Sequence, residues 1–340
     1  TQLFLTPLLA FFGAPADVMP YAKVYVRITS IGFPCLILTA GGCHLIRADG
    51  SPKMSLGCNL IGAGINTVLD AIFVLGFRWG MAGLATIIGQ IVSAAVVIYY
   101  LAHYKTVHLG KKQLSVESRC AVNIMALGTA SFFNQVAMMI VQIVLNKSLT
   151  HYGELSEYGA AIPLACAGIV TKVGQLFFSV IIGISQGTQP IESFNYGAKQ
   201  FGRVREAYNL AVRAGAIISV VSFLIFQVFP GEILALFGTG SDAYFKFGIK
   251  FLRVYLFFTF VNFLQPITST FFTSIGKPQK GTFLSLTRQI VFLLPLTLIL
   301  PLFVGIDGIM YAAPVADCLA AVIAITMAVK EFREMKKLEA

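Results

Sequence analysis

Asn66 and Asp70 are an amide and a carboxylate that could together bind a cation or exchange a proton, and they lie inside an apolar stretch. They are four residues apart in INTVLD (65–70), so on a helix they face the same side. Asn59 extends this polar stripe by about two turns. A charged side chain at the centre of a membrane helix costs about 2.5–3.5 kcal/mol even on the lenient insertion scale. We therefore expect Asp70 to face the interior of the protein.

Two interpretations of Asp70 are open. In the first, it is a proton or cation site, because burial favours the protonated carboxyl and the ionised form, with the Asn66 carbonyl, offers the oxygen ligands that a hard cation such as Na⁺ prefers. In the second, Asp70 stays protonated and only joins two helices by a hydrogen bond. Ionisable residues within membrane spans commonly mark ion pathways, which favours the first interpretation.

The apolar stretches around the motif identify the class of protein. The chain of 340 residues is 57% hydrophobic and 12% charged, with a mean hydropathy of +0.80. Its apolar runs exceed twenty residues, which is the length that crosses a bilayer as a helix. The sequence therefore predicts an all-α, polytopic integral membrane protein in contact with the lipid bilayer. Its nine expected spans are 24–46, 54–77, 80–102, 121–146, 158–186, 206–229, 247–275, 281–303 and 306–329.

The net charge of +10 could indicate a nucleic-acid partner, but the positions of the basic residues indicate membrane topology. Loops on the opposite side hold only Arg78, Lys147 and Lys246. Since cytoplasmic loops are rich in Lys and Arg, we place the basic loops and the C-terminus in the cytoplasm and expect no nucleic acid. The basic set is Arg47, Lys53, Lys105, Lys111, Lys112, Arg119, Lys199, Arg203, Arg205, Lys277, Lys280, Lys330, Arg333, Lys336 and Lys337.

Metal and disulfide chemistry find no support in the sequence. The six cysteines have no CxxC spacing and, except for Cys120, lie well inside apolar runs, so we interpret them as small buried apolar residues. The four histidines are scattered and form no ligand motif. We expect no cofactor and no metal beyond a possible Na⁺ at Asp70 and Asn66.

Four pairs of landmarks indicate an internal duplication. FGAPAD (12–17) resembles FGTGSD (237–242), Arg27 resembles Arg253, the Gly-x-Pro turn at Gly50 resembles that at Gly276, and GMAG (80–83) resembles GIDG (305–308). Each pair is 225 or 226 residues apart. Both copies would cross the membrane in the same direction, as in transporters built from parallel repeats.

The repeat predicts the domain organisation. Six spans belong to the second half but only three to the first, preceded by a short apolar stub, so we expect three spans before Thr1 and a twelve-span protein. We predict the remainder of an N-terminal lobe over 1–103, a cytoplasmic linker over 104–120, a C-terminal lobe over 121–330 and a cytoplasmic tail over 331–340.

Two sequence motifs resemble a known family. GISQGTQPIESFNYGAKQFGRVREA (183–207) is similar to the signature after the eighth span of the multidrug and toxic compound extrusion (MATE) family, and LIRADGSPK (45–53) with INTVLDAIFVLGFRWGMAGLATIIGQ (65–90) resembles its DinF-like bacterial branch. The resemblance implies two parallel six-helix lobes around a cleft with alternating access. It also implies expulsion of drugs and organic cations in exchange for H⁺ or Na⁺, by a monomer in the bacterial inner membrane.

The resemblance also implies partners for the Asp70 site. In DinF-like relatives the Asn and Asp belong to a proton or sodium site, to which a Tyr and a Thr contribute, and Tyr25 and Thr86 match these positions. Both could instead be ordinary, Tyr25 at the membrane interface and Thr86 bonded to its own helix. The second copy has Val291 and Pro295 in place of the Asn and Asp, which favours one coupling site, in the first half.

Other polar residues are candidates for the substrate cleft or for gating. Lys172 and Asp317 lie near mid-span in the second half, and Arg288 is near enough in depth to pair with Asp317. Gln186 and Asn195 flank Pro190, which we expect to end a helix, so that 187–205 forms a cytoplasmic hinge loop. A plain basic turn is the alternative for this segment.

The sequence favours a multidrug or organic-cation antiporter. The alternative within the same superfamily is a lipid-linked saccharide flippase, which the basic residues Lys172 and Arg213 keep open. A membrane enzyme would need convergent His, Asp or Glu side chains near one interface, and none is evident. The major facilitators share the 6+6 arrangement, but their basic loop motif is not visible. We therefore expect a transporter and no enzyme.

Overall fold

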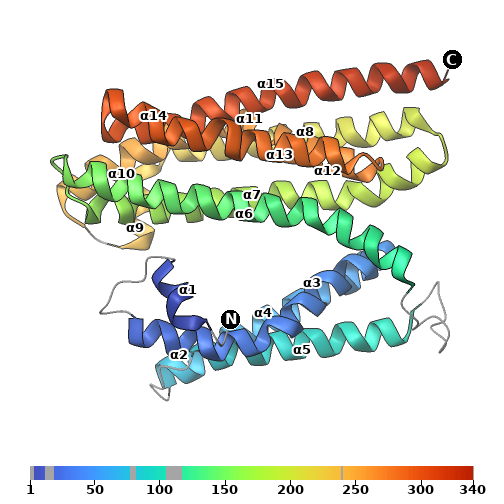
Figure 1. Ribbon diagram of the computed structural model, residues 1–340, viewed down its shortest axis with the longest axis horizontal. Coiled ribbons are helices and arrows are strands. Elements are labelled where there is room, and N and C mark those ends of the chain that lie inside the picture. Colours follow the sequence, from blue (N-terminus) through green and yellow to red (C-terminus); the bar gives the residue numbers. More distant parts are fainter. Residues whose placement is uncertain (1–3, 12–18, 77–81, 105–116, 239, 340) are drawn as a thin grey trace. The chain divides into compact units, whose positions relative to one another are not determined.

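The described part of the protein is helical and divides into two compact units. The computed structural model describes residues 4–11, 19–76, 82–104, 117–238 and 240–339, and all regular structure within these ranges is helix (Figure 1). Unit 1 is Thr1–Glu117 and unit 2 is Ser118–Ala340. The prediction of an all-α protein is confirmed.

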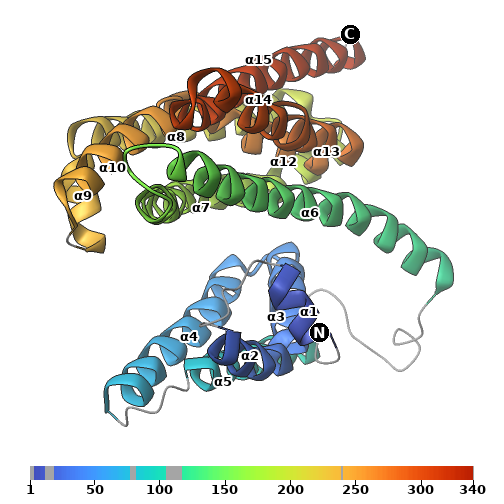
Figure 2. The ribbon, with the colours of Figure 1, turned by 60° about the vertical axis from the view of Figure 1, so that its left-hand side comes forward.

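Unit 1 contains three long helical stretches. The first is α2 with the short 3₁₀ segment η1 and α3, the second is α4 with the π-helical segment η2, and the third is α5. Helices α3, α4 and α5 pack against one another (Figure 2). The bounds are α1 Leu5–Phe11, α2 Met19–Thr29, η1 Ser30–Gly32, α3 Phe33–Ala48, α4 Pro52–Asp70, η2 Ala71–Gly76 and α5 Ala82–Ala102.

Unit 2 is built around one large apolar core. Helix α7 packs against α8, α10 and α12, and α15 packs against α14 and the π-helical segment η4. Phe247, Phe251, Phe271 and Phe272 are among its fully buried side chains. The bounds are α6 Ser118–Glu154, α7 Ala161–Gly197, α8 Phe201–Val228, α9 Pro230–Phe237, α10 Asp242–Tyr255, α11 Thr259–Asn262, α12 Leu264–Ser274, α13 Pro278–Leu286, η4 Thr287–Leu293, α14 Leu294–Val304 and α15 Ile306–Glu339.

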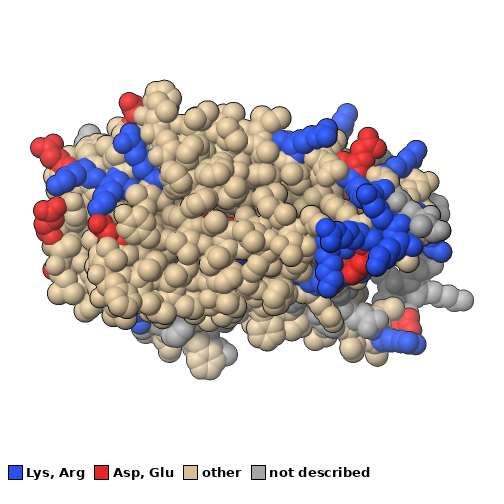
Figure 3. All heavy atoms as spheres, turned by 90° about the horizontal axis from the view of Figure 1, so that it is seen from above, with Lys and Arg blue, Asp and Glu red and all other residues tan. Residues whose placement is uncertain are grey.

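Nine stretches of the described residues are long and apolar enough to cross a membrane, and they follow the order of the nine predicted spans. On the face drawn in Figure 3, charged side chains gather toward the left and right ends, with a broad band of few charged side chains between them. This distribution is the one that a lipid-embedded surface requires. The stretches are Met19–Ala48, Pro52–Phe73, Gly83–Ala102, Phe132–Glu154, Ala161–Gly197, Phe201–Val228, Asp242–Ser274, Pro278–Val304 and Ile306–Leu338.

Several predicted features fall partly or wholly outside the described residues. Most of the predicted linker 104–120, the landmark FGAPAD at 12–17 and the start of GMAG at 80–81 lie there. Only residues 4–11 of the predicted apolar stub are described, and Leu5–Phe11 of these form α1.

The predicted hinge loop at 187–205 is wrong. Helix α7 continues through Pro190 to Gly197, and α8 begins at Phe201. Proline is tolerated inside a membrane helix where neighbouring hydroxyls and helices satisfy the backbone. Just before the proline, the hydroxyls of Ser185 and Thr188 bond main-chain carbonyls of their own helix. Only a short turn around Lys199 therefore joins the two helices.

The two Gly-x-Pro turns confirm part of the predicted repeat. Gly50 and Gly276 have φ angles of 76° and 75°, a left-handed conformation that glycine adopts without strain. The amide of Ser51 donates to Ile46 O at 3.1 Å, and the amide of Lys277 donates to Phe272 O at 2.8 Å. Each turn thus ends one helix with the same hydrogen bond, and a proline begins the next helix in both copies.

The same two positions join the helices on either side of each turn, although the hydroxyl that donates is on opposite partners in the two copies. In unit 1, Ser55 Oγ donates to Cys43 O at 3.1 Å. In unit 2, Ser269 Oγ donates to Gly281 O at 2.8 Å. Cys43 and Ser55 are each 226 residues before their counterparts. The repeat therefore extends from the turn to the polar contact that fixes the packing of its two helices.

Helices α4 and α5 approach closely at two glycines. A Cβ at Gly89 would lie 2.7 Å from Gly62 O, and a Cβ at Gly62 would lie 1.9 Å from Ser93 Oγ. Small residues of this kind let membrane helices pack backbone to backbone. The close approach brings α5 against the turn of α4 that carries Asn66.

We predict that Gly89→Ala destabilises unit 1, because its methyl group would push against a backbone carbonyl. Overpacking of this kind costs about 1–3 kcal/mol. Thermal unfolding of the purified protein in detergent should show a lower Tm than the wild type. Gly64→Ala on α4 is the matched control, since a Cβ at Gly64 meets nothing within 4 Å; an equal loss in both variants would contradict the account.

Candidate functional site

The first candidate site lies on α4 and α5 of unit 1. Asn66 Nδ2 donates to Thr86 Oγ1 at 3.4 Å, so the structure joins two of the four residues predicted for the coupling site. No hydrogen bond to the amide oxygen of Asn66 is found among the described residues. These two residues line a cavity of about 230 Å³ together with Leu36, Thr39, Asn59, Gly62, Ala63, Gly89, Gln90 and Ser93.

Asp70 lies one helical turn beyond Asn66, at the end of α4. It is the last residue before the π-helical segment η2, and π segments within helices are frequent at functional sites. Asp70 is partly buried, and its Oδ1 is buried without a hydrogen-bond partner among the described residues. A buried carboxylate oxygen without a donor is costly, so the group is suited to hold a proton or a cation.

Tyr25 is not joined to this group in the structure. It lies on α2, and 48% of the residue is exposed. Its main-chain carbonyl accepts a hydrogen bond from Thr29 Oγ1 at 3.0 Å, while no hydrogen bond from its phenol to Asn66 or Asp70 is found in the described residues. The role of Tyr25 in the coupling site stays a prediction.

The second candidate site lies in unit 2, where Arg288 pairs with Asp317. Arg288 Nη2 lies 2.6 Å and Nε 2.7 Å from Asp317 Oδ1, which confirms the predicted pairing. Asn262 Nδ2 donates to Asp317 Oδ2 at 2.8 Å, so both carboxylate oxygens are satisfied. Asp317 is only 4% exposed.

The segments that carry this group come from three parts of unit 2. Arg288 is in the π-helical segment η4, Asp317 is at the middle of α15, and Asn262 ends α11. The Arg288 guanidinium lies 5.8 Å from the centre of the Phe178 ring on α7, a cation–π distance. Sequence reasoning missed Asn262, although a lone amide within the apolar run TFVNF was a signal for it.

The other predicted gating residues are not part of this group. Lys172 is exposed on α7. Asn195 is buried, and its Nδ2 donates to Ile191 O at 2.8 Å while its own carbonyl accepts from the Gln200 amide, so it helps to end α7. Gln186 lies about two turns before Asn195 on α7 and is partly buried. The gating role of these residues stays a prediction.

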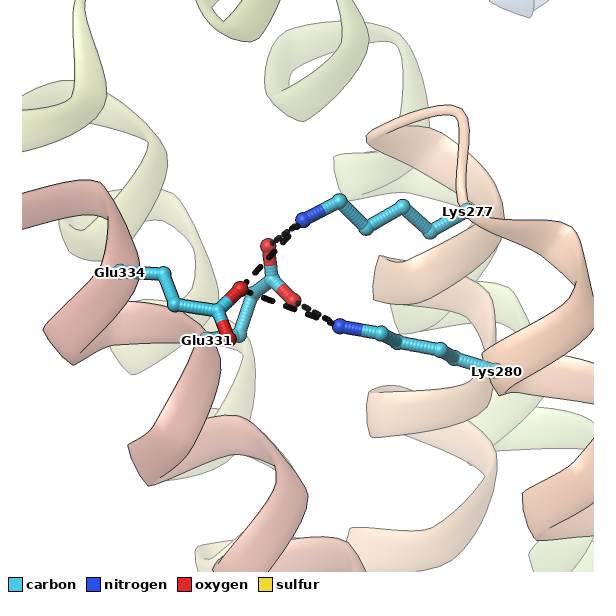
Figure 4. A network of polar contacts seen from close by, with 4 residues as sticks. All are labelled: Lys277, Lys280, Glu331 and Glu334. Carbon is cyan, nitrogen blue, oxygen red and sulfur yellow. Dashed lines mark hydrogen bonds and ion pairs between the residues drawn. The ribbon is translucent and has the colours of Figure 1, made fainter. Parts of the chain in front are cut away.

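A network of charged side chains joins α15 to the Gly276 turn at one end of unit 2. Figure 4 shows Lys277 and Lys280 reaching toward Glu331 and Glu334. Lys280 Nζ lies 2.7 Å from Glu331 Oε2, and Lys277 bonds the other oxygen of the same carboxylate. Burial lowers the pKa of Lys277, but Glu331 more than offsets this and holds the pKa above its ordinary value. Residues that we predicted as a tail are therefore part of the helical packing of unit 2.

Comparison with known families identifies the chain. The model of the MatE family matches residues 1–72 and 130–299, which is more than half of the sequence. The chain belongs to the MatE family. Members of this family are transporters, and the expectation that the protein is no enzyme is confirmed on this ground. Membership in the DinF-like branch stays a prediction.

Curated relatives of this MatE chain are bacterial export proteins. Multidrug export protein MepA from Staphylococcus aureus (strain MSSA476) is 22% identical over 328 residues, which are 96% of this chain and 70% of MepA. MepA from Staphylococcus haemolyticus (strain JCSC1435) is 22% identical over 330 residues, with the same coverage of both chains.

Solved structures confirm the MATE fold. An outward-facing multidrug resistance MATE family transporter of the MOP superfamily matches with a TM-score of 0.88 and 21% identity, over 99% of this chain and 75% of the other. A MOP superfamily transporter from Pyrococcus furiosus matches with a TM-score of 0.88 and 21% identity, over 98% of this chain and 75% of the other. The reverse polarity of the binding pocket of that transporter suggests a different function for it.

We predict that Arg288→Met alone destabilises this MatE protein far more than Arg288→Met combined with Asp317→Leu. Removing one partner leaves a buried charge uncompensated, at a cost of about 3–5 kcal/mol, whereas replacing both charges by apolar groups is often nearly neutral. The Tm of the two variants in detergent measures the difference. Equal Tm values would show that the pair is not a buried unit.

Glu331 and Glu334 offer a second test, because they differ in burial within one network. Glu331 is 1% exposed and is hydrogen-bonded to two lysines, whereas the side chain of Glu334 is 44% exposed and 3.7 Å or more from both. We predict that Glu331→Gln lowers the unfolding free energy by about 2 kcal/mol or more, and Glu334→Gln by less than about 1 kcal/mol. Thermal unfolding of both variants side by side checks this, and a reversed order would refute it.

Proposed function

We propose that the protein exports drugs and organic cations by exchange for H⁺ or Na⁺, with Asp70 as the coupling group. The observation that carries this proposal is the buried Oδ1 of Asp70, which lacks a hydrogen-bond partner in the described residues and lies one turn from the Asn66–Thr86 pair. MepA, a curated relative over nearly the whole chain, is a multidrug export protein. The family membership and the site thus support the same function.

The chemistry of the Asp70 group suits either coupling ion. A proton would remove the charge of the buried Asp70 carboxylate, because a neutral carboxyl is cheaper to bury than a carboxylate. For Na⁺, the ionised Asp70, the amide oxygen of Asn66 and the hydroxyl of Thr86 are oxygen ligands of the type that hard cations prefer. In both cases the site alternates between a bound coupling ion and a free carboxylate.

A free Asp70 carboxylate would favour the binding of a cationic substrate from the cytoplasm, and uptake of H⁺ or Na⁺ from outside would favour its release. The substrate and the coupling ion would thus compete for the same carboxylate. Transport by this competition requires that the site open to each side of the membrane in turn. We propose that this alternation takes place in the bacterial inner membrane, in a monomer with a cytoplasmic C-terminus.

The flippase alternative has less support from the charges in unit 2. A lipid-linked saccharide carries phosphate, which would need unneutralised basic residues. Asp317 neutralises Arg288, whereas Lys172 and Arg213 are exposed on α7 and α8. Because MepA, a relative over 96% of the chain, is a multidrug export protein, the antiporter interpretation is the one that we adopt.

The proposed function predicts that Asp70→Asn inserts into the membrane normally but loses ethidium efflux from cells, by about tenfold or more. The amide keeps the size of the side chain and removes its ability to exchange a proton or cation. Efflux is followed by ethidium fluorescence in cells of an efflux-deficient bacterium, with the amount of protein in the membrane measured in parallel.

Asp307→Asn is the matched control for this experiment. Asp307 pairs with Lys250 at 2.7 Å in unit 2, with its side chain 32% exposed, so its loss should leave efflux close to the wild-type rate. Collapse of the proton and sodium gradients in turn would then identify the coupling ion. Wild-type efflux by Asp70→Asn would mean that Asp70 only joins helices.

A further inference from the structure

The Arg288–Asp317 pair lines a cavity that the coupling site in unit 1 does not use. This cavity has a volume of about 160 Å³. Its polar lining includes Arg288, Asp317 and Asn262, and Gln142, Gln175 and Gln289 add amide groups. Gln142 and Gln175 are exposed, so the cavity opens at the surface of unit 2 and its charged pair lies at the bottom.

Two hydrogen-bonding atoms of the Arg288, Asp317 and Asn262 group have no partner among the described residues. Arg288 uses Nε and Nη2 on Asp317, while its Nη1 donates to none of the described residues. Asn262 uses Nδ2 on Asp317, and its Oδ1 is buried without a partner in the described part of the chain. Asn262 is 5% exposed, so this orphaned acceptor is costly unless something enters the cavity to donate to it.

The charges of the cavity select the kind of ligand that could fill these groups. Arg288 and Asp317 together are neutral. A lone cation would be repelled by the guanidinium, and a lone anion would be repelled by the carboxylate. A zwitterion adds no net charge: its carboxylate can accept from the free Nη1 edge of Arg288, in a charge-assisted hydrogen bond. Its ammonium can donate to Asn262 Oδ1.

The walls of the cavity suit an apolar chain behind such a head group. Leu145, Val170 and Leu293 contribute apolar surface, and the Phe178 ring lies over the guanidinium. The volume holds a small head group and a few carbon atoms, so the rest of a larger molecule would remain at the mouth. A buried ion pair is weak evidence of a stabilising role, and ionisable groups within membrane spans are by default candidates for functional sites.

We propose that this cavity of unit 2 is a subsite for amphipathic zwitterions, in which Arg288 holds the carboxylate and Asn262 the ammonium group of one head. As a statement about substrate class it rests on the proposed export function. Its test measures binding, which export through Asp70 does not affect.

The experiment compares two fluorescent probes that differ by one carboxylate. Nε-dansyl-L-lysine carries a zwitterionic head, and dansylcadaverine is the same molecule without the carboxylate. Both are titrated at pH 7 against the purified full chain carrying Asp70→Asn, which removes the proposed cation site of unit 1, in detergent micelles with empty micelles as the blank. We expect Nε-dansyl-L-lysine to bind about tenfold tighter or more, the effect of one charge-assisted hydrogen bond.

Variants assign the preference to the cavity. Arg288→Met combined with Asp317→Leu should abolish the preference for Nε-dansyl-L-lysine, and Asn262→Leu should reduce it severalfold. Lys250→Gln combined with Asp307→Asn removes an ion pair outside the cavity and should leave the preference unchanged. Circular dichroism and the Tm of each variant confirm that it is folded, and Asn262→Leu, which keeps the ion pair, decides the outcome if the double variant is unstable.

Equal affinities of the two probes for the Asp70→Asn protein would overturn the proposal. Retention of the preference in both Arg288→Met/Asp317→Leu and Asn262→Leu would overturn it as well. A zwitterion preference when the wild-type protein exports no ethidium would instead contradict the proposed export of organic cations and leave the subsite standing.

Discussion

The cost of a charge inside an apolar membrane helix is the constraint on which the two candidate sites depend. Such a charge must be neutralised by a partner, by a proton or by a bound ion. Unit 2 satisfies this constraint within the protein, because Arg288 and Asn262 together engage both oxygens of Asp317. In unit 1 the Oδ1 of Asp70 has no such partner among the described residues, which leaves this oxygen open to a proton or a bound cation. This difference is why we assign ion coupling to Asp70 and not to Asp317.

The internal repeat shows how one helical frame carries both arrangements. The glycine turns at Gly50 and Gly276 match closely in geometry, and the same two positions join the helices beside each turn by a hydroxyl that is on opposite partners. Further along the same pair of helices the copies diverge, because Asn66 and Asp70 of the first copy correspond to Val291 and Pro295 of the second. The second copy instead carries Arg288, whose charge Asp317 on α15 neutralises. A π-helical segment follows Asp70 and another contains Arg288, so each copy departs from regular helix near its ionisable residue.

Much of this arrangement could be predicted from residue patterns, and the failures have physical causes. Long apolar runs predicted the spans, and the i, i+4 spacing placed Asn66 and Asp70 on one face. The pairing of Arg288 with Asp317 followed from their similar depth. Pro190 misled the prediction of a loop, because a membrane helix tolerates proline where hydroxyls and neighbouring helices support its backbone. Asn262 and Glu331 were missed because their partners are 55 and 54 residues away in the chain, and such contacts depend on how helices pack, which local spacing does not encode.

The most direct test of the central claim is to count the protons released when ethidium binds to the purified protein in weakly buffered detergent solution, with and without Na⁺. If Asp70 exchanges a coupling ion for the cationic substrate, the wild type releases protons, or its ethidium affinity falls as Na⁺ replaces another salt at constant ionic strength. In that case Asp70→Asn shows neither effect. Proton release and sodium sensitivity equal to those of the wild type in Asp70→Asn would contradict the assignment of Asp70 as the coupling group.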